Sequence, residues 1–325
     1  MNGSLLQTFS PSGQGRIHWT STARSALRAV LLHLRRTGAL PDKNGELLVP
    51  RWVCTCCYNT IHKVCFPSIQ DTPSLRGVFV YHQYGFPQKL DRIAQRCRER
   101  GLFLIENCVN SVFDGPSAHG MGEAGLATIF SFPKMFDTVL GGALVTRDPE
   151  LEAFCEKYFQ EDEAWVVRLA HAARWLHDSP LKIRSTKFHE IVYALSDYGR
   201  NALPSDVERM TSDVEGGAVA RRKSNYQRLL REFSDAPLFQ GLEPDVIPFA
   251  VPAFGPDEFL SRLAARLTAA GWDAGVYRFD VARDLFEPNF APCVPLPVDP
   301  GMSESRINLM IDIVRAEWRS FDGQR

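Results

Sequence analysis

The sequence predicts an α/β protein: a mostly parallel sheet flanked by helices forms the main domain, and a smaller α+β domain follows it. In the first half of the chain, short apolar segments of strand length alternate with amphipathic segments of helix length. Residues 102–105 are apolar throughout, which is typical of a strand in a sheet covered on both faces. A length of 325 residues indicates about two domains.

The expected division has three parts. Residues 1–15 are rich in Ser, Gly and Pro and are expected to form a loose N-terminal arm. Residues 16–200 would form the large α/β domain, and residues 201–325 the small one.

The large domain is expected to open with a helix from about residue 23. Leu27, Val30 and Leu31 share one helical face, and Thr22 can cap the helix. Residues 90–100 form a second amphipathic helix, which Gly101 ends. Strands are expected at residues 47–49, 77–81, 102–105, 127–130 and 143–146.

The second half begins with a mainly helical region at about residues 149–199, to which the sequence assigns no role. The remaining pattern predicts helices at residues 219–233, 256–270 and 303–318, and strands at residues 246–252 and 275–279.

Charge and hydropathy exclude several classes of protein. The net charge of −1 offers no basic surface for nucleic acid or anionic lipid. No segment reaches the roughly 18 apolar residues of a membrane span. The first residues lack the charged and apolar parts of a signal peptide, so a cytoplasmic protein is expected.

Eight cysteines are expected to be reduced thiols, as in other long cytoplasmic chains. Cys54, Cys56 and Cys57, with Cys65 nearby, raise the question of a metal site. No second Cys pair or His pair lies at the spacing of a zinc site. We therefore predict no metal, and interpret these cysteines as small apolar groups packed at a strand-to-helix junction.

Lys134 is the strongest candidate for a catalytic residue. It lies between two predicted strands, three residues after Ser131 and before Gly141 and Gly142. A lysine in a partly buried site loses its proton readily and can form a Schiff base with a cofactor carbonyl. Ser131 can donate to a phosphate, and the glycines let the backbone pass close to its surroundings. An isolated S-x-x-K would more often be a surface loop, so the assignment depends on the rest of the chain.

The segment 128–146 resembles the lysine motif of the DegT-type sugar aminotransferases, a branch of the fold-type-I pyridoxal phosphate enzymes. Its serine and lysine lie closer together than in the commonest form of that family. Other stretches match in the same order, so that the likeness covers about residues 20–315. They are residues 23–27, 49–54, 104–110, 221–226 and 295–298.

The resemblance implies that Lys134 holds pyridoxal 5′-phosphate as a Schiff base. The cofactor phosphate would lie at the helix start formed by Thr22, Ala23 and Arg24, with help from Ser131, because a helix N-terminus binds anions. Trp52 lies in the stretch that resembles the turn beside the cofactor ring, where it could stack on the ring or instead pack in the core. Tyr84 is a second aromatic candidate for this contact.

The chain departs from the family at the contacts to the cofactor ring. Asn107 stands where the family has an aspartate that keeps the pyridine nitrogen protonated, and Asn110 where it has His or Gln. A neutral amide cannot supply the charge that makes the ring an electron sink. Glu106 is expected to point the other way along its strand. Conventional transamination should therefore be weakened.

Three functions remain open. The first is an aminotransferase that moves an amino group from glutamate to a nucleotide-linked keto sugar, in a homodimer with its active site at the subunit interface, as the resemblance implies. The second is a pyridoxal phosphate enzyme of altered chemistry, which Asn107 and Asn110 suggest. The third is a degenerate paralogue that acts as a partner subunit.

Overall fold

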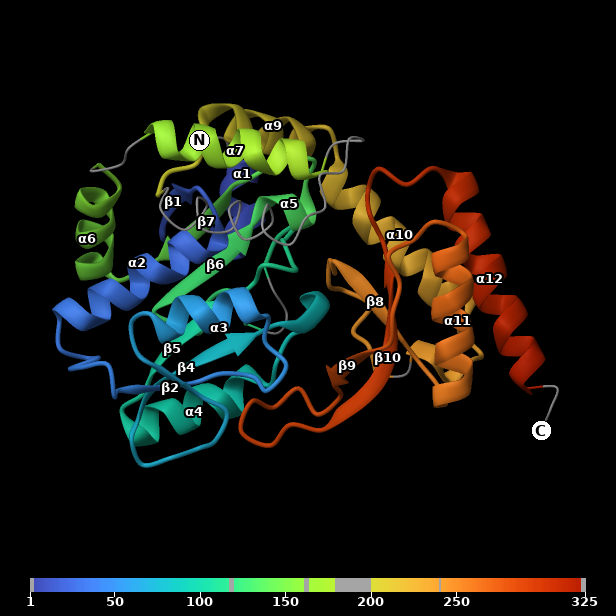
Figure 1. Cartoon of the computed structure of the whole chain (residues 1–325), viewed down its shortest axis with the longest axis horizontal. Helices are drawn as coiled ribbons and strands as arrows, with labels where there is room; N and C mark the ends of the chain where they lie inside the picture. The colour runs from blue at the N-terminus through green and yellow to red at the C-terminus, as the bar shows by residue number, and fades with distance from the viewer. Residues whose placement is uncertain (1–2, 117–119, 161–163, 179–199, 240, 323–325) are drawn as a thin grey trace.

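The computed structural model describes residues 3–116, 120–160, 164–178, 200–239 and 241–322 (Figure 1). Its large domain is built on a seven-stranded sheet of order β1-β7-β6-β5-β4-β2-β3. The strands are β1 (Arg16–Thr20), β2 (Glu46–Leu48), β3 (Phe66–Ser68), β4 (Leu75–Tyr81), β5 (Phe103–Asn107), β6 (Ala127–Ser131) and β7 (Gly142–Thr146). Pairing from β6 to β3 is parallel, whereas β7 runs antiparallel to β6 and to β1. The predicted mostly parallel sheet is confirmed.

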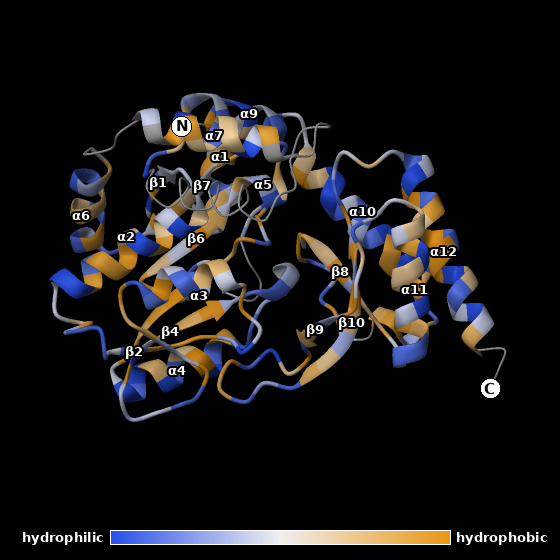
Figure 2. Ribbon diagram, in the orientation of Figure 1, coloured by the Kyte–Doolittle hydropathy of each residue, from blue (hydrophilic) through white to orange (hydrophobic). Residues whose placement is uncertain are grey.

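Helices cover both faces of this sheet, because its strands carry apolar side chains on both sides. One core joins the sheet to α2 (Ala23–Arg36), α3 (Thr55–His62) and α6 (Pro149–Gln160). The other core joins it to α4 (Leu90–Arg100) and to α9 (Pro204–Glu215). Figure 2 shows the central strands as the apolar layer between helices whose outer faces are polar. Gly101 ends α4, as the sequence indicated, because its backbone adopts the left-handed conformation with a φ of 63°.

The N-terminal segment is not the loose arm that its composition suggested. Gly3–Phe9 form helix α1, and Phe9 is fully buried. The Phe9 ring packs edge-on against Trp19 at 5.5 Å and Phe130 at 5.2 Å. Ser, Gly and Pro are frequent here, but the apolar side chains among them stabilise the segment on the sheet.

The small domain pairs a three-stranded antiparallel sheet with helices on one side. The sheet has the order β8-β10-β9 and contains β8 (Ala250–Phe254), β9 (Tyr277–Asp280) and β10 (Phe290–Pro297). Its helices are α10 (Ala218–Glu232), α11 (Asp257–Ala269) and α12 (Glu304–Asp322). The sequence did not predict β10, because three prolines interrupt its pattern.

The region without an assigned role is helical over α6 and α7 (Ala164–Asp178). The rest of it, residues 179–199, lies outside the described residues. A short helix, α5 (Phe132–Met135), follows β6 and carries Lys134. Among the helices described, none combines the length and the apolar character needed to cross a membrane.

The carboxyl ends of β4, β5 and β6 point to the same edge of the sheet, because the three strands are parallel. Tyr81, Asn107 and Ser131 are the last residues of these strands. In open α/β sheets, ligands bind at this edge.

Candidate functional site

Most of the predicted site residues line one cavity of about 220 Å³ at this edge of the sheet. Thr22, Ala23, Arg24, Ser131 and Lys134 all border it, although more than 100 residues of chain separate the first from the last. The structure thus brings together the lysine, the serine and the helix start that the sequence placed in one site.

The lysine segment is held at both ends. Ser131 ends β6 and stands at the N-cap of α5, and the Phe136 amide donates to the Phe132 carbonyl at 2.8 Å. Pro133 occupies the first turn, where its missing amide hydrogen costs nothing. This one-turn helix places Lys134 on the cavity wall.

Gly141 and Gly142 return the chain from the lysine to β7 past the start of α2. Gly141 adopts a φ of 113°, and its amide donates to the Ser21 carbonyl at 2.8 Å. A Cβ on Gly142 would lie 2.8 Å from the Ala23 nitrogen and 2.6 Å from the Phe130 oxygen. The close passage expected from the glycine pair is therefore observed, and it joins the lysine segment to the helix N-terminus.

Helix α2 begins where the sequence predicted. Thr22 is its N-cap, and the Thr22 side chain accepts from the Ser25 amide at 3.1 Å. Ala23 and Arg24, in the first turn of α2, line the cavity together with two further basic residues, Lys134 and Arg174. The N-terminus of α2 and these basic side chains together favour the binding of an anion, such as a phosphate, in the cavity.

Arg222 supports the lysine segment from the small domain. Its side chain is 2% exposed and donates to the Met135 carbonyl at 3.2 Å and to the Phe249 carbonyl at 3.2 Å. Burial lowers the pKa of Arg222 to about 10, which leaves it cationic at neutral pH. The guanidinium thus ties the segment after Lys134 to the strand region of the small domain.

Asn107 and Asn110 are buried and are not among the residues that line the cavity. The Asn107 Oδ1 accepts from the Val109 amide at 3.2 Å, and Val109 does line the cavity. The Asn110 Oδ1 accepts from the Tyr81 hydroxyl. With Oδ1 accepting, the amide nitrogen of Asn107 is left as a donor.

The Glu106 side chain points away from the lysine cavity, as the alternation along the strand indicated. It is fully buried and accepts from the amides of Gly122 and Ala124, each at 2.7 Å. The His82 Nε2 lies 3.1 Å from a Glu106 oxygen, while the His82 Nδ1 accepts from the Gln88 amide. Because Nδ1 accepts, Nε2 carries the hydrogen and donates to Glu106.

Trp52 lies apart from the lysine cavity. It is 52% exposed and borders a neighbouring cavity of about 280 Å³, together with Tyr81 and Phe290. Its ring contacts Phe290 edge-on at 6.4 Å. Tyr84 stacks on Phe279 at 6.0 Å instead of bordering either cavity. The segment from Val49 to Cys57 therefore separates the two cavities.

Three cysteines of this segment also line the lysine cavity: Cys54, Cys56 and Cys57. Hydrogen bonding from Cys56 lowers the pKa of the Cys54 thiol, with a smaller contribution from the Lys134 charge. The sequence interpretation treated these residues as packing only. It also missed Arg174, because the helical region at about residues 149–199 was assigned no role. It missed Arg222, because residues 221–226 were noted as a resemblance to the family and no contact was expected from them.

Known proteins resemble the chain in part of its sequence and in its fold. Residues 69–164 match the DegT/DnrJ/EryC1/StrS aminotransferase family. A dTDP-4-dehydro-2,3,6-trideoxy-D-glucose 4-aminotransferase of Saccharopolyspora spinosa is 35% identical over 82 residues, which are 25% of this chain and 21% of the relative. The GDP-perosamine synthase of Escherichia coli O157:H7 is 24% identical over 175 residues, 47% of this chain and 48% of the relative.

The matched part thus spans at most about half the length of these curated relatives. Among solved structures, a putative sugar aminotransferase of Streptococcus pneumoniae in its PLP form superposes with a TM-score of 0.63 at 16% identity. The superposition covers 97% of this chain and 89% of that one. This likeness shows the fold, and residues 69–164 contain the strand that ends at Asn107 and the whole lysine segment up to Gly142. The chain is thus similar to the DegT/DnrJ/EryC1/StrS aminotransferase family over residues 69–164, and it shares the fold of the putative sugar aminotransferase over nearly its whole length.

Proposed function

We propose that the protein is a pyridoxal phosphate-dependent aminotransferase that acts on a nucleotide-linked keto sugar. The observation that carries this proposal is the single cavity in which Lys134, Ser131 and the N-terminus of α2 meet. Each feature alone has an ordinary structural explanation. Their convergence, from segments far apart in sequence, is what a lysine-bound phosphate cofactor requires.

The residues present fit this cofactor. The first-turn amides of α2 and the Ser131 hydroxyl are donors for its phosphate, and Arg24 and Arg174 add positive charge to the same wall. Pyridoxal phosphate supplies a carbonyl for the lysine and a ring that withdraws electrons. Lys134 would hold the cofactor covalently, and its freed Nζ would take the proton from the carbon that carries the transferred amino group.

The substrates follow from the relatives. The two curated proteins are named for a dTDP-linked and a GDP-linked sugar, so a nucleotide-linked keto sugar is the proposed acceptor, with glutamate as the amino donor. We place the enzyme in the cytoplasm, since all eight cysteines are free thiols. We also propose a homodimer, with the active site at the subunit interface.

Asn107 favours a second candidate, a pyridoxal phosphate enzyme in which transamination is slow or replaced. Its amide nitrogen can donate to an unprotonated pyridine nitrogen but supplies no charge to protonate it. The ring would then withdraw electrons less strongly.

A visible spectrum with added pyridoxal phosphate tests the proposal. We expect the absorption of a lysine-bound cofactor, its loss on addition of glutamate, and a cofactor fixed to the peptide of Lys134 after borohydride reduction. Lys134→Ala should abolish all three signals, whereas Lys157→Ala, at an exposed lysine of α6, should keep them. Cofactor fixed to a different lysine would contradict the site.

Retention of the cofactor without any response to glutamate or other amino acids would favour the second candidate. Failure to bind the cofactor at all would leave only the fold in common with the family.

A further inference from the structure

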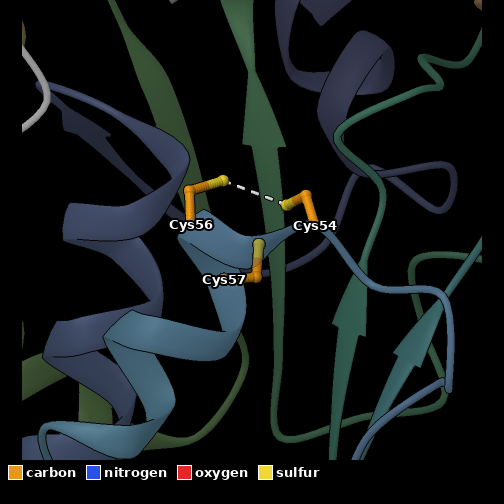
Figure 3. A group of neighbouring side chains, drawn as sticks. All are labelled: Cys54, Cys56 and Cys57. Atoms are coloured by element: carbon orange, nitrogen blue, oxygen red, sulfur yellow. Dashed lines mark hydrogen bonds between the residues drawn. The ribbon is translucent and has the colours of Figure 1, made fainter. Parts of the chain in front are cut away.

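Three thiol groups lie close together at the start of α3 (Figure 3), and all three residues line the lysine cavity. Cys54 is the N-cap residue of α3, and Cys56 and Cys57 belong to its first turn. The three Sγ atoms all lie within 4.8 Å of one another. Cys54 Sγ and Cys56 Sγ are 3.0 Å apart, which is well beyond the about 2.05 Å of a disulfide bond.

This spacing fits three thiolates around one metal ion. Zinc–sulfur bonds of about 2.3 Å in a tetrahedral site separate the sulfurs by about 3.8 Å. The distance of 3.0 Å between the Cys54 and Cys56 Sγ atoms lies below that value, and no two of the three Sγ atoms are more than 4.8 Å apart. Small rotations of the exposed Cys54 side chain and the half-buried Cys56 side chain would bring the sulfurs to the separation of a zinc site, while burial holds Cys57 in place.

The surroundings of the cluster balance the charge of such a site. Lys134 interacts electrostatically with Cys54, and Arg24 with Cys56. The N-terminus of α3 also favours negative charge at its first turn. A complex of three thiolates and a divalent ion carries one net negative charge, which Arg24 alone would neutralise.

Among the described residues, a second group of side chains that could bind a metal is already occupied by hydrogen bonds within the protein. It consists of His82, Glu106 and Cys108, all buried. His82 and Glu106 are bonded to each other, and backbone amides occupy the His82 Nδ1 and both Glu106 oxygens. That group is therefore a structural network.

We propose that Cys54, Cys56 and Cys57 bind a zinc ion with three thiolates and leave its fourth coordination position open to the cavity of Lys134. Three protein ligands and an exchangeable fourth position are the arrangement of zinc sites that bind water or substrate. The sequence argued against zinc because a second pair at the usual spacing is missing. Three ligands from one helix start make that pair unnecessary.

Cobalt titration of the full-length protein tests the site. The protein is stripped of metal with a chelator, kept reduced with a phosphine, and titrated with Co²⁺ and, in competition with a chromophoric chelator, with Zn²⁺. We expect one ion per chain, a thiolate-to-cobalt charge-transfer band and the visible d–d bands of a tetrahedral site. These d–d bands lie at longer wavelength than the absorption of pyridoxal phosphate, so the result does not depend on the proposed function.

Cysteine variants identify the ligands. Cys54→Ser and Cys56→Ser remove exposed and half-buried thiols, so these variants should fold, as circular dichroism can verify. Each should lower zinc affinity by more than the about tenfold that loss of an outer-shell partner costs. Cys97→Ser, at a buried cysteine of α4, should bind as the parent does. Absence of stoichiometric binding, or unchanged affinity in Cys54→Ser and Cys56→Ser, would overturn the proposal.

Discussion

At the scale of single residues, the proposed contact of Asn107 with the cofactor ring would determine how well the site transaminates. The asparagine is 1% exposed and bonded to the Val109 amide, so its orientation is fixed by the backbone that follows β5. An aspartate would fit the same space and accept the same hydrogen bond. What the substitution changes is the charge available to a pyridine nitrogen.

We therefore expect Asn107→Asp to increase the rate of half-transamination with glutamate. An increase of about tenfold corresponds to a barrier lowered by about 1.4 kcal/mol. Rapid-mixing absorbance would measure it, with Asn44→Asp on the exposed surface as the matched control. Without cofactor the variant should be less stable than the parent, because its buried carboxylate lacks a partner. A parent that transaminates quickly and a slower variant would show that Asn107 belongs to a working site.

A second expectation at this scale concerns the cap of α2. Thr22→Ala removes the acceptor for the Ser25 amide, and should lower the free energy of unfolding by about 1 kcal/mol. The same change should weaken binding of the cofactor phosphate, because it loosens the first turn of α2. Urea unfolding and cofactor titration measure the two effects. Thr37→Ala, at the other end of the helix, should change stability without changing cofactor affinity.

At the scale of elements, the lysine segment depends on supports from other parts of the chain. Arg222 in α10 binds the carbonyl after Lys134, and Asp206 in α9 faces the loop that leads to Gly141. Both side chains are at most 3% exposed. The position of Lys134 is therefore set by helices that follow it by about 70 to 90 residues.

Arg222→Met should destabilise the protein by roughly 1–3 kcal/mol, because the buried hydrogen bond to the Met135 carbonyl and the partly buried one to the Phe249 carbonyl are both lost. It should also weaken cofactor retention, since the lysine segment loses its tie to the small domain. Chemical unfolding and gel filtration of the loaded protein measure the two effects. Arg221→Met changes an exposed arginine of the same helix and should do neither. Equal effects of both variants would argue against this role.

Asp206 should make stability depend on pH. Burial raises its pKa above the ordinary 3.8, and the nearby His171 opposes the shift. The pKa of this carboxyl is higher in the folded protein than in the unfolded chain, so folding favours the protonated form. The resulting stabilisation is complete below the pKa of the unfolded chain and is lost as the pH rises through the pKa of the folded protein. Asp206→Asn cannot ionise, so its stability relative to the parent should increase from acid to neutral pH. Thermal unfolding across this range measures the difference.

Glu208→Gln, at an exposed position of the same helix, controls for the general loss of a negative charge. A parent and an Asp206→Asn variant with the same pH profile would show that the Asp206 carboxyl is compensated in the folded state.

At the scale of the whole molecule, an exposed apolar surface borders the cavity of Trp52. Trp52 and Ile69, which are 52% and 54% exposed, form this surface, and Tyr58 in α3 and Phe66 in β3 are two further exposed apolar residues, at 36% and 49%. Trp52 and Ile69 line the same cavity, next to the segment that carries the three cysteines. Exposed apolar groups collected in this way are typical of a surface that binds a partner. The expected homodimer would bury it and bring the two active sites to the interface.

Ile69→Glu should therefore shift the protein from dimer to monomer at micromolar concentration, because a charge in an apolar interface costs several kcal/mol. Sedimentation velocity measures the change. Leu309→Glu places the same charge at an exposed apolar position of α12, in the small domain, and should leave the dimer intact. A monomeric parent would contradict the expectation, and so would a dimer unaffected by Ile69→Glu.

The sequence by itself determined the large domain and the position of the lysine. Apolar runs such as residues 102–105 and the glycine after α4 are local signals, because strand burial and helix ends depend on residues close together in the chain. The Thr22 cap was also readable, since it depends on a few consecutive residues. The glycine pair after Lys134 indicated a close passage of the backbone, but its neighbours, Phe130 and Ala23, were not readable from the sequence.

Only the tertiary structure decided which of these residues share a cavity. It brought Arg174 and the three cysteines to Lys134, moved Trp52 to a neighbouring cavity and turned the expected arm into α1 around Phe9. It also showed that β10 forms despite its prolines, with β8 paired on one side and β9 on the other. Contacts between distant segments depend on the packing of the whole chain, and no local pattern of residues encodes them.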